Sequence, residues 1–119
     1  MARIIFYRGD IHWVEFPTQL TGTKIHTIQA QHPAVIISNN QQNQFSPVLT
    51  VLPITSQLDK IYPFEVLIQL EKPSKILLDQ ITTIDKTFAK KKIASLTDLE
   101  MTKVEKLLHS TLALRCYQK

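Results

Sequence analysis

The sequence has little cysteine and no long hydrophobic run. Cys116 is the single cysteine, so the chain can form neither an internal disulfide nor a cysteine-based metal site. Apolar runs such as 34–37, and 48–52 with its one threonine, are far shorter than the roughly 20 residues that cross a bilayer. The apolar stretch at 4–7 is too short for a secretory signal. We therefore expect a cytoplasmic protein that does not enter a membrane.

Charge is almost absent from one long stretch of the chain. Between Pro17 and Leu58 the only formally charged residue is Lys24, and His26 and His32 are the other groups there that can become cationic near neutral pH. Such a segment can be a plain surface connector. Loops longer than about 12–15 residues in compact domains are often binding or active-site loops, however, which favours a function here.

Positive charge is in excess over the whole chain. Fourteen Lys and Arg against ten Asp and Glu give a net charge of +4, which favours an acidic or polyanionic partner. One basic cluster stands out, formed by Lys86, Lys90, Lys91 and Lys92. It is either a solvated turn before the last helix or a contact for phosphate or an acidic peptide.

The length and composition predict one folded domain over residues 1–119. Hydrophobic residues make up 44% and charged residues 20% of the chain, both typical of globular proteins. A second core would leave too little buried surface for either.

Alternating and β-branched segments predict a sheet. The segments expected to be strands are Asp10 to Phe16, Ala34 to Ser38, Val48 to Ile54, Tyr62 to Leu70, Lys75 to Leu78 and Gln80 to Ile84. Asp79 then lies in or beside a strand, and needs a partner if it is buried. The polar tract 39–44 is expected to be a turn or a short helical connector.

A helix is predicted after Thr97. Thr97 and Glu100 match a capping box, in which each side chain accepts a hydrogen bond from the other residue's backbone N–H. An apolar stripe follows, which we expect to pack on the sheet as core; it comprises Met101, Val104, Leu107, Leu108, Thr111, Leu112 and Leu114. The fold class is thus mainly β with a C-terminal helix, either a small barrel or a strongly bent antiparallel sheet.

Five stretches, in this order and spacing, resemble the MazF/PemK family of toxin endoribonucleases. They are RGDIHWVEF at 8–16, PAVIISN at 33–39, VLPITSQ at 51–57, YPFEV at 62–66, and LDQ at 78–80 followed by TID at 83–85. The resemblance covers nearly the whole chain. It implies an SH3-like barrel of the kind shared with gyrase-poisoning toxins (the MazF/CcdB type), a two-fold homodimer and an acidic MazE-like antitoxin as partner, with operator DNA bound only through that antitoxin.

The same resemblance implies cleavage of single-stranded RNA without a metal or other cofactor. The ribose 2′-hydroxyl attacks its own phosphate and leaves a 2′,3′-cyclic phosphate and a 5′-hydroxyl. This step requires a base, an acid and donors to the phosphoryl oxygens. Thr55 aligns with the family's active-site threonine, and its hydroxyl can donate to a phosphoryl oxygen.

The chain departs from the family at one catalytic position. His32 stands where the family has an arginine before the Pro-Ala-Val strand. A histidine loses most of its charge above about pH 6.5, but it carries protons better than arginine near neutrality. His32 is therefore a titrating phosphate donor, one of an acid and base pair with His26, or a polar surface residue without a catalytic role.

Further residues are predicted from the resemblance to contact ligands. The candidates for RNA contact are His26, Thr27, Ser56, Gln57, Asp79 and Gln80, and those for antitoxin contact are Lys90, Lys91 and Lys92. The altered arginine position leaves other functions open. The chain can instead be a catalytically weakened module that binds an antitoxin, or a protein binder like the gyrase poisons.

Overall fold

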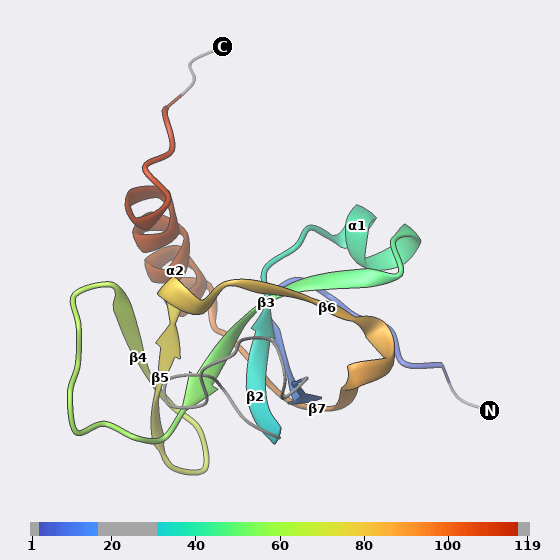
Figure 1. Ribbon diagram of the computed structural model, residues 1–119, viewed down its shortest axis with the longest axis horizontal. Coiled ribbons are helices and arrows are strands. Elements are labelled where there is room, and N and C mark those ends of the chain that lie inside the picture. The colour runs from blue at the N-terminus through green and yellow to red at the C-terminus, as the bar shows by residue number, and fades with distance from the viewer. Residues whose placement is uncertain (1–2, 17–30, 117–119) are drawn as a thin grey trace, which may run out of the picture.

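The computed structural model describes residues 3–16 and 31–116, which form a bent antiparallel sheet and a C-terminal helix (Figure 1). The strands are β1 (Asp10–Glu15), β2 (Gln31–Ile36), β3 (Val48–Thr55), β4 (Glu65–Gln69), β5 (Pro73–Leu77), β6 (Thr82–Asp85) and β7 (Ala89–Ser95). The helices are α1 (Asn40–Phe45), α2 (Asp98–Thr111) and the 3-10 turns η1 (Leu78–Gln80) and η2 (Lys86–Phe88). Within the described residues, no helix is both long and apolar enough to span a membrane.

Strand β3 organises the sheet. The strand order is β4-β5-β3-β2-β1-β7, and β6 also pairs with β3. On the edge of β3 away from β2, residues 48–51 pair with β6 and residues 54–55 pair with β5. Because one edge serves two partners, the sheet bends along β3 and stays open between β4 and β7. The predicted fold class is confirmed in its form as a strongly bent sheet with a C-terminal helix.

The two faces of the sheet bury separate apolar clusters. Along β2, Val35 belongs to the cluster under α2, while Ala34 and Ile36 belong to the cluster on the opposite face. The same alternation places Leu52 of β3 on the α2 side and Val51 on the other. Burial on both faces explains why β2 reads as a continuous apolar run, as expected for a central strand.

A glycine turn and a side-chain clamp fix the start of β1. Gly9 has φ +91°, in the left-handed region that favours glycine, and its N–H donates to the Ile36 carbonyl at 2.7 Å. The neighbouring Arg8 guanidinium donates to the Ile37 carbonyl at 2.9 Å and to Glu105 of α2 at 2.6 Å. These contacts join the first strand, the second strand and the helix.

Helix α2 begins as predicted, but its apolar stripe is only partly core. The capping box between Thr97 and Glu100 is present in both directions. Val104 and Leu108 are buried on the sheet, whereas Leu112 and Leu114 lie beyond the last helical residue and are exposed. The prediction that the whole stripe is core is therefore wrong for its second half, because the helix ends at Thr111.

The strand bounds differ from the prediction at several places, and β2 in particular begins at Gln31, so that His32 lies within a strand. β3 continues to Thr55, and Pro53 lies between the segments that pair with β6 and β5, an interrupted position where proline's missing N–H is tolerated. The strand expected from Gln80 begins instead at Thr82. Residues 89–95 form strand β7 at the sheet edge, where a turn was the alternative considered.

Candidate active site

The pairing of β2 with β3 brings the two predicted catalytic residues together. Ala34 lies opposite Pro53, so the beginning of β2 runs beside the end of β3. The ring Nδ1 of His32 lies 3.3 Å from the carbonyl oxygen of Ile54, the residue immediately before Thr55. The fold thus places an imidazole and a hydroxyl on neighbouring strands at one end of the sheet.

The contact between His32 and the Ile54 carbonyl determines which ring nitrogen of His32 carries the hydrogen. A carbonyl oxygen can only accept, so Nδ1 of His32 carries the hydrogen and donates to Ile54. Nε2 is then the nitrogen left for a ligand. In the neutral ring Nε2 is a proton acceptor, and in the cation it is a second donor.

The hydroxyl of Thr55 is oriented by a local turn. Its Oγ1 accepts a hydrogen bond from the backbone N–H of Gln57 at 3.2 Å. Accepting this bond leaves the hydroxyl hydrogen available to donate. Ser56 and Gln57 follow Thr55 as exposed residues, so their side chains are open to a ligand bound at Thr55.

A polar bridge holds the strand segment that carries His32. The Trp13 indole donates to Gln31 Oε1 at 2.7 Å, and the Gln31 amide donates to Glu15 at 3.1 Å. Both partners belong to β1, with Glu15 directly opposite Gln31 in the register. Gln31 is therefore fixed one residue before His32.

Sequence reasoning missed a buried ion pair beside Thr55. Lys75 of β5 lies directly opposite Thr55, and its ammonium is 3.0 Å from the carboxylate of Glu65. The two side chains are 8% and 4% exposed. Opposite charges on one face of a hairpin were the available signal, but the pairing depends on the β4 to β5 register, which the sequence does not fix.

The structure describes only two of the four remaining RNA-contact candidates. Asp79 and Gln80 form the 3-10 turn η1 after β5, anchored by the fully buried Leu78. Asp79 is exposed, so the buried, partnered acid considered from the sequence is not what the structure has. His26 and Thr27 lie outside the described residues.

The lysine cluster lies on the edge strand β7 and the turn before it. Lys90 donates to the Thr87 carbonyl at 2.9 Å and lies 3.8 Å from Glu15, while Lys92 lies 3.5 Å from Asp10. Lys91 is exposed between them. Of the two alternatives for these three lysines, a turn is not what the structure has, because a strand presents them along a sheet edge.

One acid beside this cluster has a perturbed pKa. The backbone N–H of Thr87 and then its hydroxyl donate to Asp85, and these hydrogen bonds lower the pKa of the Asp85 carboxyl from its ordinary value. The carboxylate caps η2 and stays charged near neutral pH, next to Lys86.

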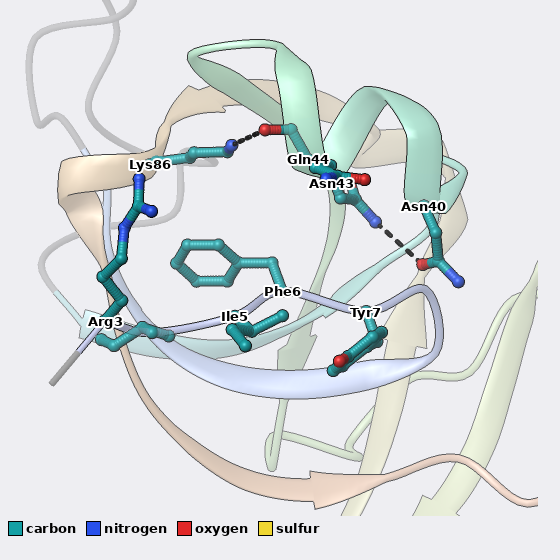
Figure 2. A pocket seen from close by; sticks show the side chains of 9 residues that line it. Arg3, Ile5, Phe6, Tyr7, Asn40, Asn43, Gln44 and Lys86 are labelled. Atoms are coloured by element: carbon teal, nitrogen blue, oxygen red, sulfur yellow. Dashed lines mark hydrogen bonds between the residues drawn. The ribbon is translucent and has the colours of Figure 1, made fainter.

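A cavity lies between the N-terminal segment, α1 and η2. Figure 2 shows the ring of Phe6 projecting into this space of about 610 Å³. The Lys86 ammonium donates to the Gln44 carbonyl at 3.5 Å across one side. The lining residues are Arg3, Ile4, Ile5, Phe6, Tyr7, Asn40, Asn43, Gln44 and Lys86. None of the predicted RNA-site residues is among them.

Comparison with known proteins identifies the family. Residues 7–112 match the model of the PemK-like, MazF-like toxins of type II toxin–antitoxin systems. The chain belongs to this family. It is 36% identical to endoribonuclease EndoA of Bacillus subtilis, over 93% of this chain and 97% of that protein. It is also 34% identical to endoribonuclease MazF of Staphylococcus saprophyticus, over 90% of this chain and 91% of the relative.

A solved complex shares the fold of this MazF-like toxin. The Deinococcus radiodurans MazF in a MazE–MazF structure superposes with a TM-score of 0.75, at 23% identity, covering 95% of this chain and all of that one. The predicted fold is thereby confirmed, and that structure contains MazE together with MazF.

Proposed function

We propose that this MazF-like toxin cleaves single-stranded RNA by activating a ribose 2′-hydroxyl against its own phosphate. The products are a 2′,3′-cyclic phosphate and a 5′-hydroxyl. The observation that carries the proposal is the pair of groups at the end of β2 and β3, the His32 ring 3.3 Å from the Ile54 carbonyl and the adjacent Thr55 hydroxyl. Endoribonuclease activity agrees with the two curated relatives.

We assign His32 and Thr55 different roles in the reaction. Neutral His32 presents Nε2 as the base that accepts the 2′-hydroxyl proton, while its Nδ1 stays on the Ile54 carbonyl. The Thr55 hydroxyl donates to the phosphoryl oxygen on which charge develops. His26, which precedes β2 in the sequence, is the proposed acid for the leaving 5′-oxygen. No step draws on a cofactor.

The RNA-contact residues extend this site. Ser56 and Gln57 follow Thr55 directly and are exposed, and their side chains supply polar groups for RNA bases or phosphates. Asp79 and Gln80 supply further polar groups from η1. Thr27, which precedes β2 in the sequence, completes the proposed set.

Mapping of product ends tests this function. The purified toxin is incubated with a long unstructured RNA in the presence of EDTA, and the new 5′ ends are labelled by polynucleotide kinase with and without prior phosphatase treatment. We expect ends that accept label without phosphatase, because they carry a free 5′-hydroxyl. Ends that need phosphatase would contradict the proposed chemistry.

A second function is favoured by one observation. The arginine position of the family holds His32, so loss of cleavage would leave a toxin-like module that binds an antitoxin and, through it, operator DNA. Intact RNA together with tight antitoxin binding in the same preparation would favour this alternative.

The proposed antitoxin contact includes the lysines of β7. Substitution of Lys90, Lys91 and Lys92 by glutamine is expected to slow association with the acidic antitoxin by about tenfold at low salt, because these charges steer encounter. Stopped-flow measurements across a salt series check it. A matched control replaces Lys72, Lys103 and Lys106 by glutamine, which removes the same charge elsewhere. Equal rates in the two variants would assign no antitoxin role to β7.

The chain is also proposed to form a homodimer. Leu99, Leu112 and Leu114 are exposed apolar side chains at the ends of α2 and just beyond it, and burial between protomers would remove them from water. Light scattering at micromolar concentration is expected to give twice the 13.7 kDa chain mass. A single-chain mass at every concentration would contradict the dimer.

A further inference from the structure

The ion pair of Lys75 and Glu65 ties together three parts of the chain. The Lys75 ammonium lies 3.0 Å from Glu65 Oε1 and also donates to the backbone carbonyl of Lys60. The same Glu65 oxygen accepts from the backbone N–H of Tyr62 at 2.9 Å. Lys60 and Tyr62 belong to residues 56–64, here called the 56–64 loop, which connects β3 to β4. The pair therefore fastens this loop to β4 and β5.

The 56–64 loop begins at the proposed active site. Its first residues, Ser56 and Gln57, directly follow Thr55, and Lys75 is the residue opposite Thr55 in the register. The loop also exposes an apolar surface. The rings of Tyr62 and Phe64 stack with centroids 5.2 Å apart, and the Lys60 ammonium lies 5.3 Å from the centre of the Tyr62 ring. An exposed aromatic ring flanked by a cation is a surface on which an unstacked RNA base can stack.

A buried ion pair is a poor source of stability by itself. Taking both charges out of water costs about as much as their attraction returns, and well-packed apolar residues often replace such a pair without loss. Lys75 and Glu65 nevertheless each make a further hydrogen bond to a backbone group of the same loop. This arrangement fits a role in placing the loop better than a role in holding the sheet.

We propose that Lys75 and Glu65 are positioning residues that hold the 56–64 loop against the sheet so that it can receive RNA beside Thr55. The inference rests on the proposed RNA-cleaving function. It adds a second requirement to that function, since catalysis needs both the His32 and Thr55 groups and a loop fixed in place. Lys75 and Glu65 act through the loop and touch no reacting atom.

Two variants separate positioning from stability. Lys75→Met alone leaves the Glu65 carboxylate buried without its cation, so Tm should fall. The double variant Lys75→Met with Glu65→Leu removes both charges, so Tm should return close to that of the wild type. The loop has then lost its bonds to both side chains. We expect KM for RNA in the double variant to be about tenfold higher than in the wild type, which is the effect of losing one hydrogen bond to a charged group. The change in kcat should be smaller. The control Lys72→Met changes a nearby exposed lysine and should alter neither value.

A second readout does not depend on RNA cleavage. The peptide bond after Lys60 is a trypsin site within the loop, and its cleavage rate under native conditions reports how often the loop opens. In the double variant we expect this rate, followed by mass spectrometry, to rise by at least about tenfold. If the wild type cleaves no RNA, the proposed function fails while the trypsin result still tests the anchor. Wild-type KM and trypsin rate in a well-folded double variant would overturn the inference.

Discussion

Replacement of Thr55 by alanine is expected to lower kcat for RNA cleavage by about 10²-fold, the typical cost of one lost donor to a developing oxyanion. KM should change little, because the hydroxyl acts mainly on charge that appears in the transition state. The half-buried side chain lies at the end of β3, outside both apolar clusters, so Tm should stay close to that of the wild type. Single-turnover cleavage of a short fluorescent RNA measures the effect.

Two further substitutions at Thr55 identify the group responsible. Thr55→Ser keeps the hydroxyl and its bond to the Gln57 N–H, and should retain most of the activity. Thr55→Val keeps the shape and loses the hydroxyl, and should resemble the alanine variant. Wild-type activity in Thr55→Val would show that the hydroxyl has no catalytic role.

Removal of the imidazole by His32→Ala is expected to lower kcat by at least about 10²-fold, the usual contribution of a positioned acid or base. Nδ1 of His32 is occupied by the Ile54 carbonyl, so Nε2 works as a base only in the neutral ring. The base must be neutral while the acid, proposed as His26, is protonated, so the cleavage rate should pass through a maximum as the pH is varied.

Substitution of His32 by the family's arginine distinguishes a base from a cationic phosphate donor at this position. Arginine stays protonated and cannot accept the 2′-hydroxyl proton, so His32→Arg should reduce activity if His32 is the base. If His32 is instead a cationic phosphate donor, the wild-type rate should only fall with rising pH and His32→Arg should raise it. Such a result would replace the base mechanism with the donor mechanism.

Most of the sheet and the helix start follow from local pattern. The alternation along β4 places Val66 and Ile68 inside and Leu67 outside, as the period of two predicts. The capping residues Thr97 and Glu100 mark the start of α2, because their hydrogen bonds are local in sequence. The pairing of β2 with β3, which brings His32 to the Ile54 carbonyl just before Thr55, is a tertiary contact, and only the family resemblance predicts it.

Features set by distant contacts could not be read from the sequence. Strand β7 reads AKKKIAS, with no alternation, and it is a strand because it pairs with β1. Lys75 and Glu65 meet because of the register between β4 and β5, which places Lys75 opposite Leu67. The apolar stripe predicts core residues beyond Leu108 that the structure does not have, since the chain leaves the helix at Leu112 and takes φ 55° at Ala113.

The central claim is that the toxin uses the RNA's own 2′-hydroxyl as nucleophile. Once a cleavage site has been mapped, the most direct test is a matched pair of oligonucleotides that differ only by a single 2′-deoxy substitution at the nucleotide preceding the broken bond. Both are incubated with the wild-type protein, and binding is measured in parallel with the Thr55→Ala variant. We predict that the two bind with similar affinity and that the deoxy substrate is not cleaved. Cleavage of the deoxy substrate at that bond would contradict the mechanism.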